Sequence, residues 1–217
     1  MVRHEYEKLM KTLDKEIALM GALCEQSVAM ASKAILNRDH ELAKKSGPLD
    51  DEIDKKERAI EELCLKIILQ QQPVASDFRR VSAALKLITD MERIGDEATA
   101  IVELLDKVKY NNEGRDYFKK MAATTVSMLG IAIESFVKRD IKSARKIEAM
   151  DDVVDQSYES MKDWLVKEIT EDPTNGKEYM ELFLASKYFE RIGDHIVNIS
   201  EWVEFSVTGV HKGERIS

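Results

Sequence analysis

Glu92-Arg93-Ile94-Gly95-Asp96 occurs twice in this chain of 217 residues, because the same five letters return at residues 190–194. The second copy begins 98 residues after the first, so each half of the chain carries one. In an α-helix, residues i and i+4 differ by only about 40° in direction, so the glutamate and the aspartate of each copy share one face. The motif therefore predicts two helices, each with two carboxylates one turn apart.

Both acid pairs interrupt an apolar helical stripe. The residues that share the direction of the motif glutamate are mostly apolar, namely Val81, Leu85, Ile88 and Thr99 in the first half, and Tyr179, Phe183, Ser186 and Val197 in the second. Like charges at this spacing repel each other, and a half-buried carboxylate must find a cation or give up its charge. A bound metal ion would satisfy both demands.

A second acidic motif repeats in the same way. Residues 50–54 (DDEID) correspond to residues 151–155 (DDVVD), with an offset of 101 residues, and each copy again begins and ends with an aspartate. Because successive helices of a bundle run antiparallel, the two acid pairs of one half can meet. The sequence thus predicts two carboxylate clusters, composed of Asp50, Asp54, Glu92 and Asp96 in the first half and of Asp151, Asp155, Glu190 and Asp194 in the second.

Four carboxylates supply only oxygen ligands, which suit hard cations such as Mg²⁺, Ca²⁺, Mn²⁺ or Fe³⁺. Carboxylates also bridge neighbouring ions, so a site with several metals is plausible. Glu57 lies about 20° from the direction of Asp50 and is a candidate extra ligand, whereas its counterpart Tyr158 is not. The alternative is a solvated acidic face, which is the usual location of such pairs. Four pairs in register, two of them on apolar stripes, favour the metal sites.

Composition and periodicity predict an all-α protein. Hydrophobic residues make up 44% of the chain and charged residues 34%, and nine Gly and three Pro leave few breaks in long amphipathic helices. Apolar spacings of three and four place six long helices at about residues 5–36, 39–70, 76–110, 116–137, 140–169 and 178–205. Short connections between them predict two tandem antiparallel three-helix bundles.

The breaks between helices have recognisable signals. Asp39 and Asp140 are candidate N-caps. We expect Gly47-Pro48 to bend or briefly interrupt the second helix, and Pro73 to prevent its continuation. The segment 111–114 (NNEG) is the candidate boundary, which gives an N-terminal bundle of residues 1–112 and a C-terminal bundle of residues 113–217. The tail after Val207 is expected to be frayed.

The charge and the cysteines limit the possible environments. Thirty-three Lys and Arg against 41 Asp and Glu leave a net charge of −8, which argues against a general nucleic-acid or anionic-membrane surface. Cys24 and Cys64 lie in helical contexts and are interpreted as small buried hydrophobes in a reducing compartment. No signal peptide and no apolar run of about 18 residues is visible, so we expect a cytoplasmic protein.

Other functions fit the sequence less well. A ferritin-like di-iron oxidase requires Glu-x-x-His pairs, and no Glu in this chain has His three residues later, so we expect no enzyme of that class. Arg79-Arg80 and Lys107 to Lys109 form no basic recognition face for DNA. His195 is interpreted as a surface or partly buried histidine rather than a ligand. A metal-free helical scaffold, whose acidic faces attract a basic partner, remains the alternative.

Residues 72–80 (QPVASDFRR), which run into the first ERIGD motif, closely resemble the PhoU family of phosphate-signalling proteins. The second ERIGD motif, followed by residues 198–203 (NISEWV), resembles the C-terminal repeat of the same family. The resemblance covers nearly the whole chain. It departs mildly at Phe78, where Leu is common, and at the Gly-Pro of the second helix, which lies close to Asp50 in the sequence.

The resemblance implies a fold and a function. PhoU-like proteins are two three-helix bundles with a repeated Glu/Asp-x-x-x-Asp motif, which falls here on the eight acids named above. Members bind metal, in some cases as multinuclear iron clusters, with Mn, Mg or Zn as the other possible ions. They damp phosphate uptake and signalling by acting between the ATPase subunit of the Pst transporter and the PhoR sensor histidine kinase. We therefore expect a homodimeric adaptor, peripheral to membrane complexes, that is not an enzyme and does not bind nucleic acid.

Overall fold

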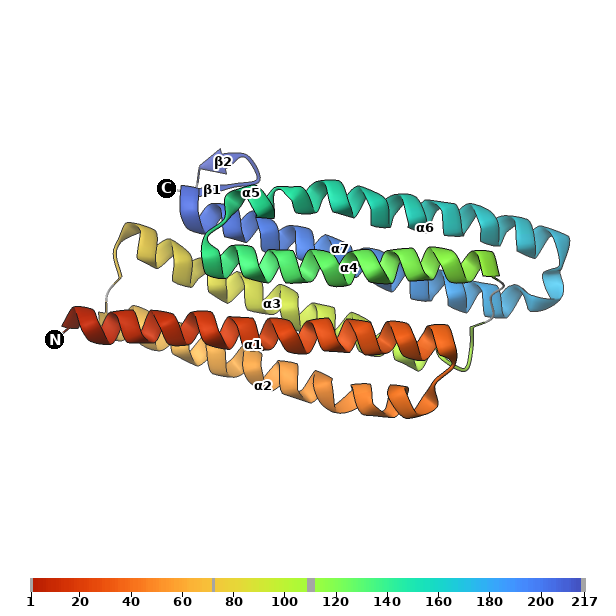
Figure 1. The fold of residues 1–217 in the computed structure, drawn as a ribbon, viewed down its shortest axis with the longest axis horizontal. Coiled ribbons are helices and arrows are strands. Elements are labelled where there is room, and N and C mark those ends of the chain that lie inside the picture. Colours follow the sequence, from red (N-terminus) through yellow and green to blue (C-terminus); the bar gives the residue numbers. More distant parts are fainter. Residues whose placement is uncertain (1, 72, 109–111, 216–217) are drawn as a thin grey trace.

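The computed structural model describes residues 2–71, 73–108 and 112–215. Residues Gln72, Lys109 and Asn111, on which parts of the predictions fall, lie outside that description. The six long helices expected from the sequence are present (Figure 1), and they are α1 (Val2–Asn37), α2 (His40–Gln71), α3 (Ala75–Glu103), α4 (Asn112–Lys138), α6 (Lys146–Glu171) and α7 (Gly176–Thr208). The all-α prediction is confirmed.

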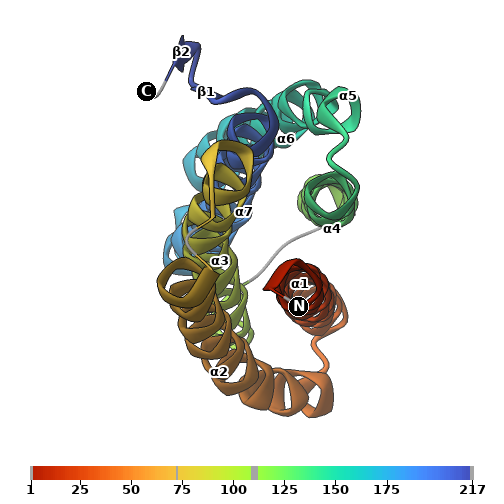
Figure 2. The ribbon, with the colours of Figure 1, turned by 90° about the vertical axis from the view of Figure 1, so that its left-hand side faces the viewer.

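The helices form one curved layer with two helices on its inner side. Viewed from the end, α2, α3, α7 and α6 follow one another around the curve, and α1 and α4 lie within it (Figure 2). α1 packs on α2 and α3, and α4 packs on α6 and α7, so each half is a three-helix bundle. The halves meet where α3 packs against α7 and α1 against α4. The expected two bundles are therefore joined side by side along their length.

The predicted apolar periodicity is that of the core. In α1, the residues at spacings of three and four that are fully buried are Leu13, Ile17, Met20, Cys24, Val28, Ala31 and Ile35. Both cysteines are buried and free, as interpreted from the sequence. The Cys24 thiol donates a hydrogen bond of 3.3 Å to the carbonyl of Met91, which links α1 to α3 beside the first ERIGD motif.

The internal repeat extends to the turns. Asp39 accepts a hydrogen bond of 2.9 Å from the amide of Leu42, and Asp140 accepts bonds of 3.0 and 3.2 Å from two amides of the short helix α5 (Ile141–Ala144). The preceding residues, Arg38 and Arg139, have left-handed φ values of 53° and 57°. The same turn chemistry therefore begins the second helix of each half, and both predicted N-caps are confirmed.

Two helices differ from the sequence prediction. α2 continues through Pro48 without interruption, because the flanking Ser46 and Leu49 are buried and hold this segment against the core. A single proline removes only one helical hydrogen bond. The predicted helix at residues 140–169 is divided instead, since α5 ends at Ala144 and α6 begins at Lys146.

The C-terminal end also differs from its prediction. In place of a frayed tail, α7 ends at Thr208 with a left-handed Gly209, and the chain folds back as a two-stranded antiparallel hairpin, β1 (Val210–His211) and β2 (Glu214–Arg215). His211 stacks on Trp202 with ring centroids 3.9 Å apart, which holds the hairpin on α7. A cross-segment ring contact of this kind has no signal in local periodicity.

α4 contains a long apolar stretch. Residues 113–138 of α4 are long and apolar enough to cross a membrane by length and composition alone, although no uninterrupted apolar run is present. Half of the most apolar window is buried inside the protein, and core helices of soluble proteins pass the same test. Its composition is therefore accounted for by packing against α1, α6 and α7.

Candidate functional site

α2 and α3 bring together the four acids predicted for the first half. Burial raises the pKa of Asp50, and the negative charges of Asp96 and then Asp54 raise it further. Burial likewise raises the pKa of Glu92, with Asp96 as the next cause. The charge of Asp96 thus raises the pKa of an acid on the neighbouring helix α2 and of an acid on its own helix α3. The two acid pairs must therefore face each other. We call Asp50, Asp54, Glu92 and Asp96 the N-terminal acid cluster.

α6 and α7 form the equivalent arrangement in the second half. Burial raises the pKa of Asp151 from its ordinary value of 3.8 to about 7, and the charges of Asp155, Asp194 and Glu190 raise it in that order. Burial and Asp194 raise the pKa of Asp155. All four predicted acids therefore interact, and we call them the C-terminal acid cluster. The predicted convergence of the acid pairs is present in both halves.

Exposed cations partly compensate each cluster. The Arg93 guanidinium lies 3.4 Å from Glu92 Oε2 and 3.0 Å from Asp96 Oδ2. In the second half, Lys187 Nζ lies 2.5 Å from Glu190 Oε2, although not in hydrogen-bond geometry. These cations are 53% and 40% exposed, and ion pairs so exposed to solvent contribute only about 0–1 kcal/mol. Much of the repulsion among the carboxylates therefore remains.

The C-terminal acid cluster is the less compensated of the two. Asp151 Oδ1 is buried and has no hydrogen-bond partner. It is also packed closely against α7, because a Cβ atom at Gly193 would collide with it. At Gly95 the constraint is milder, since a Cβ atom would lie 3.0 Å from Ile53 Cδ1 and 3.4 Å from Asp50 Oδ1. The motif glycines thus allow α3 and α7 to approach the neighbouring helices of the clusters closely.

The donor set suits a hard cation, but the side chains are not yet arranged around one. In the described ranges, no three His, Cys, Asp or Glu side chains form a group that could hold a metal ion. The carboxylates of a cluster would have to rotate to share an ion. The unpaired Asp151 Oδ1 and the carboxylate-only chemistry fit such an ion. Metal binding by the eight acids therefore stays a prediction.

The candidate extra ligand differs between the halves. Glu57 accepts a hydrogen bond of 3.4 Å from Thr89 Oγ1, and its charge is among the causes that raise the pKa of Glu92. The equivalent Tyr158 stacks on Phe183 and has Lys187 Nζ 5.4 Å from its ring centroid. Glu57 is thus near the N-terminal acid cluster, while the second half offers an aromatic ring at that position.

The sequence missed a polar network between the two repeats. Arg191 lies 2.7 Å from Glu97 Oε1, and the Glu97 side chain is only 6% exposed. His195 Nδ1 lies 2.9 Å from Asp90 Oδ1, which also accepts a hydrogen bond of 3.3 Å from Asn198. The partly buried His195 agrees with its interpretation, but Arg191 reaches the other repeat and not its own acids. The sequence did hold one signal for this network, because Glu97 stands among apolar residues of α3.

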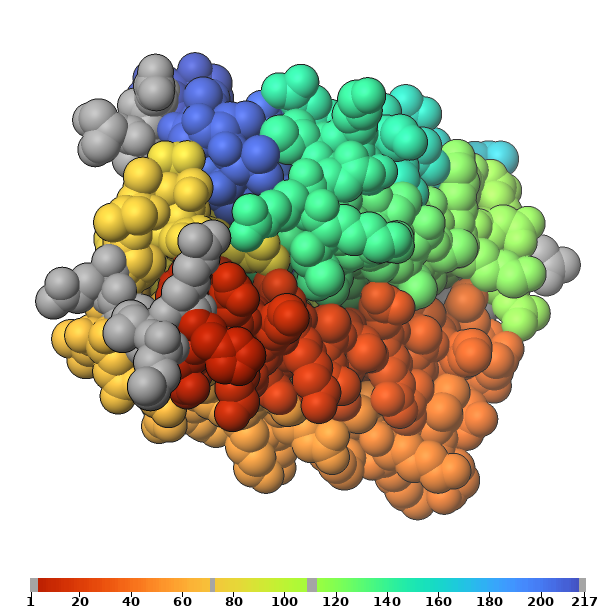
Figure 3. Space-filling model, turned by 60° about the vertical axis from the view of Figure 1, so that its left-hand side comes forward, coloured from red at the N-terminus to blue at the C-terminus, as the bar shows by residue number. Residues whose placement is uncertain are grey.

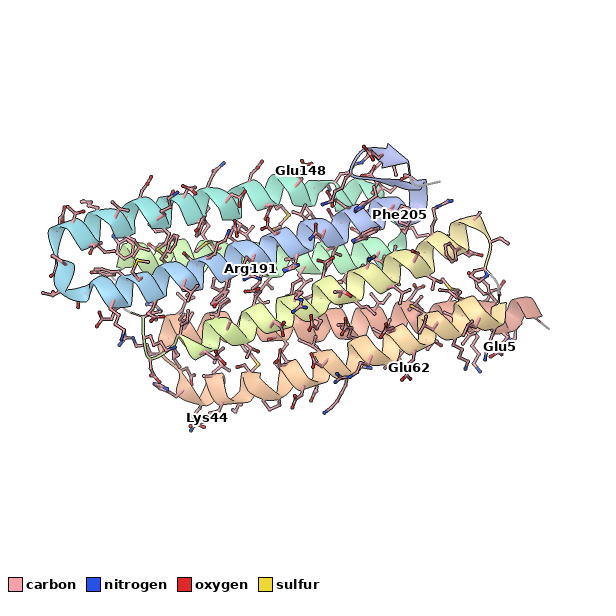
Figure 4. The ribbon with its side chains drawn as sticks, turned by 180° about the vertical axis from the view of Figure 1, so that it is seen from behind. Glu5, Lys44, Glu62, Glu148, Arg191 and Phe205 are labelled. Carbon is pink, nitrogen blue, oxygen red and sulfur yellow. The ribbon has the colours of Figure 1, made fainter. Side chains whose placement is uncertain are left out.

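This network fixes where the two ERIGD motifs lie relative to each other along the axes of α3 and α7. Arg191 belongs to the second ERIGD copy, and Glu97 directly follows the first, so the two copies lie side by side on antiparallel α3 and α7. Figure 4 shows the four-helix layer from behind, with Arg191 near its middle. The acid clusters consequently lie on either side of one central contact between the repeats.

The metal-free protein is expected to become more stable as the pH falls from about 7.5 to about 5. The pKa of Asp151 is about 7 in the folded protein and near 3.8 in an ordinary aspartate. Between these values only the folded state holds the proton, so the stabilisation is complete below the unfolded pKa and is lost as the pH rises through 7. Allowing for solvent screening, the effect is on the order of 2 kcal/mol. Thermal unfolding with chelator present measures it.

Asp151→Asn is the control for this pH dependence. Asparagine cannot ionise, so the variant should lose that part of the stability change while other acids keep theirs. A wild-type protein whose stability rises between about pH 5 and 7 would contradict the prediction.

Gly193→Ala is expected to lower the free energy of unfolding, whereas Gly95→Ala should leave it nearly unchanged. Alanine normally stabilises a helix interior by about 1 kcal/mol relative to glycine. At Gly193 the new methyl group must displace the buried carboxylate of Asp151, so the variant should lose about 1–3 kcal/mol. At Gly95 the closest atom is the end of a flexible isoleucine, so the change should be near zero. Urea unfolding of both variants compares them, and equal losses would be the contrary result.

Comparisons with known proteins agree with this geometry. The PhoU domain matches the chain twice, at residues 17–105 and 118–203, which covers the helices of both acid clusters. The PhoU homologue of Pseudomonas aeruginosa is 30% identical over 211 residues, 96% of this chain and 87% of that protein. PhoU of Escherichia coli is 31% identical over 207 residues, 94% of this chain and 86% of that protein. Both are named phosphate-specific transport system accessory proteins.

Solved structures show the same fold. The crystal structure of PhoU from Pseudomonas aeruginosa has a TM-score of 0.88 at 30% identity and covers 94% of this chain and 100% of its own. The phosphate transport system regulatory protein PhoU from Streptococcus pneumoniae, at 22% identity, has a TM-score of 0.85 over 100% of both chains and supports the fold alone. With two matched domains and relatives along nearly its whole length, the chain belongs to the PhoU family.

Proposed function

We propose that this protein is a metal-binding regulatory adaptor of phosphate homeostasis that restrains a Pst-type transporter and a PhoR-type sensor kinase. Its relatives are named accessory proteins of phosphate-specific transport and not enzymes, which supports a regulatory role without catalysis. The metal and the kinase extend this role beyond what those names state.

The uncompensated charge at Asp151 carries the metal part of the proposal. This carboxylate is largely buried, one of its oxygens has no partner, and the other three acids of the cluster are among the causes that raise its pKa. A buried carboxylate in such company must bind a cation or a proton. A hard cation would neutralise the cluster and join α6 to α7, and Asp50, Asp54, Glu92 and Asp96 would do the same for α2 and α3.

The positions of the clusters suggest how metal would affect partners. Each cluster joins a helix at the edge of the four-helix layer, α2 or α6, to a central one, α3 or α7, and the two central helices meet at the Arg191–Glu97 contact. Charge neutralisation in both clusters would therefore fix all four helices of the face seen in Figure 4. A partner that binds this face would find a rigid surface in the metal-bound protein and a more mobile one without metal.

Elemental analysis tests the metal. Protein purified without chelator is expected to contain iron, or else Mn, Mg or Zn, in stoichiometric amounts. Glu92→Gln with Asp96→Asn should lower the metal content of the first half, and Asp151→Asn with Asp194→Asn that of the second. The matched control is Asp163→Asn, an exposed aspartate of α6 outside both clusters. No metal in the wild type, or a full metal load in both cluster variants, would refute the proposal.

A metal-free scaffold is the second candidate. It is favoured by the ion pairs of Arg93 and Lys187, and by the lack of a ready group of metal ligands among the described residues. On this hypothesis, acidic helix faces bind a basic partner directly. High salt would then weaken partner binding, while chelator would leave it unchanged.

A pull-down from phosphate-replete cells tests the partners. Tagged protein should recover the transporter ATPase subunit and the sensor kinase, and recovery should fall after chelation if metal sets the binding surface. Recovery of neither protein would count against the adaptor. The proposal also includes a homodimer, which light scattering of the purified protein would confirm or exclude.

A further inference from the structure

Lys187 of α7 is a cation that the fold places against the C-terminal acid cluster. Its ammonium nitrogen Nζ lies 2.5 Å from Glu190 Oε2. Its charge also acts on Asp194 of the same helix and on Asp155 of α6. One lysine therefore interacts with acids from both helices of the cluster.

The contact between Lys187 and Glu190 rests on charge and not on a hydrogen bond. Glu190 Oε2 is buried and has no hydrogen-bond partner among the described residues. The Glu190 side chain is 16% exposed, whereas that of Lys187 is 40% exposed. The lysine can therefore turn into solvent, while Glu190 stays in the cluster.

A metal ion bound by Glu190 would compete with this ammonium. Hard cations bind carboxylate oxygens at about 2.0–2.6 Å, and Lys187 Nζ already lies at such a distance from Glu190 Oε2. Two cations at one carboxylate repel each other, and the double charge of a divalent metal increases that repulsion. The lysine must therefore leave Glu190 before an ion can use the same oxygen.

The first repeat has no cation at the corresponding position. With the offsets of 98 and 101 residues, Lys187 corresponds to Thr89, and Tyr158 corresponds to Glu57. Thr89 Oγ1 donates a hydrogen bond of 3.4 Å to Glu57, and Lys187 Nζ lies 5.4 Å from the ring centroid of Tyr158. The same two positions thus meet in both halves, but this pair adds an acid to the first half and a cation to the second.

The ring of Tyr158 gives a displaced ammonium a second position. A cation within about 6 Å of an aromatic ring centroid is attracted by its face, and Lys187 is already within that distance. Tyr158 is itself held by stacking on Phe183, with ring centroids 5.6 Å apart. Exchange of the lysine for a metal ion would therefore require rotation of one exposed side chain and no movement of the helices.

We propose that Lys187 is the internal counter-ion of the C-terminal acid cluster and competes with metal for it. The ammonium offsets part of the negative charge in the metal-free protein, and it withdraws toward Tyr158 and solvent when an ion binds. The inference rests on the proposed metal binding and adds to it a residue that sets the affinity of one cluster only. A lysine in a simple surface ion pair would leave that affinity unchanged.

Mn²⁺ binding by the full-length protein tests the competition. Free Mn²⁺ is measured by electron paramagnetic resonance in the Glu92→Gln, Asp96→Asn variant, in which the C-terminal acid cluster is the intact one. Adding Lys187→Met should tighten binding about tenfold, because it removes a unit charge a few ångströms from a divalent ion. Lys187→Arg keeps the charge and should bind Mn²⁺ as its parent does.

Thr89→Lys makes the reverse change in the first half. It introduces the ammonium beside Glu57, and in the Asp151→Asn, Asp194→Asn variant it should weaken Mn²⁺ binding by the N-terminal acid cluster about tenfold. Thr89→Met is the matched control, because it adds a long side chain without a charge, and it should leave the affinity unchanged. Equal affinities of the lysine and methionine variants would contradict competition by charge.

Lys138→Met is the control for the loss of one positive charge. Lys138 pairs with Glu134 at the end of α4, a helix that carries neither cluster and forms part of the surface in Figure 3. Its loss should not change Mn²⁺ binding. With chelator present, Lys187→Met should lower the melting temperature by roughly 2–4 °C, since the cluster loses its counter-ion, whereas no fall would overturn that role.

The outcomes separate this inference from the proposed function. If Lys187→Met binds Mn²⁺ no more tightly than its parent, then the inference is overturned while the metal sites stand. If neither the wild type nor any of the variants binds Mn²⁺, then metal binding is refuted and the inference with it. Far-ultraviolet circular dichroism checks that each variant is folded.

Discussion

Arg80→Met is expected to lower the free energy of unfolding by about 3–5 kcal/mol, because it leaves a largely buried carboxylate without its main cation. The Arg80 side chain is 7% exposed and pairs with Asp14, which is 25% exposed. The guanidinium also lies 5.5 Å from the ring centroid of Phe136, so it links α1 and α3 of the first half to α4 of the second. Burial already outweighs Arg80 and raises the pKa of Asp14.

Thermal and urea unfolding would measure this loss. For a chain of this length, each kcal/mol corresponds to roughly 2–4 °C, so the melting temperature should fall by roughly 10 °C. Lys86→Met, at an exposed lysine of the same helix, is the control and should change little. The double variant Asp14→Asn with Arg80→Met should recover much of the stability, because neither charge is then buried alone. A loss below about 1 kcal/mol in Arg80→Met would contradict the expectation.

Metal is expected to reverse which protein is the more stable. The wild type should be more stable than a C-terminal cluster variant with metal, and less stable without it. A metal present at about a thousand times its dissociation constant stabilises the folded state by about 4 kcal/mol. Asp151→Asn with Asp194→Asn should lose much of that gain. Without metal, the same variant should be more stable than the wild type, because it removes repulsion at a buried carboxylate with an unpaired oxygen.

Differential scanning calorimetry with added metal and with chelator would show the reversal. Asp163→Asn serves again as the control, and its response should match that of the wild type. If the cluster variant is less stable than the wild type under both conditions, then the carboxylates support the fold in some other way. If both proteins respond equally to metal, the ion binds elsewhere.

Local sequence rules predicted most of the helices and their caps. Apolar spacing in α1 gave its buried face, and Asp39 and Asp140 each supplied a side-chain oxygen to a helix start, which needs no tertiary information. The convergence of the acid pairs was also predictable, because an i,i+4 pair on an apolar stripe must face a neighbouring helix. These features depend on residues close together in the chain.

The features that were missed depend on contacts between distant residues. Pro48 stays within α2 because buried neighbours hold it there, and the C-terminal hairpin depends on the stacking of His211 on Trp202. The Arg191–Glu97 contact joins residues from different halves of the chain. None of these contacts alters the local pattern of apolar residues. The shifted pKa values and the orientations of the cluster carboxylates also depend on how the helices pack, so they could not be predicted from the sequence.

The contact between α3 and α7 also determines whether two copies of the same repeat could pair as the two different repeats do. With the 98-residue offset, Arg93 corresponds to Arg191, and Glu97 corresponds to His195. Of the two symmetry-related crossings, one joins Arg191 to Glu97, whereas the other would oppose Arg93 to His195, and Arg93 turns to Glu92 and Asp96 instead. Two copies of the C-terminal half alone would thus meet arginine against histidine at both crossings. The ion pair at this crossing therefore needs Glu97, which only the N-terminal half supplies.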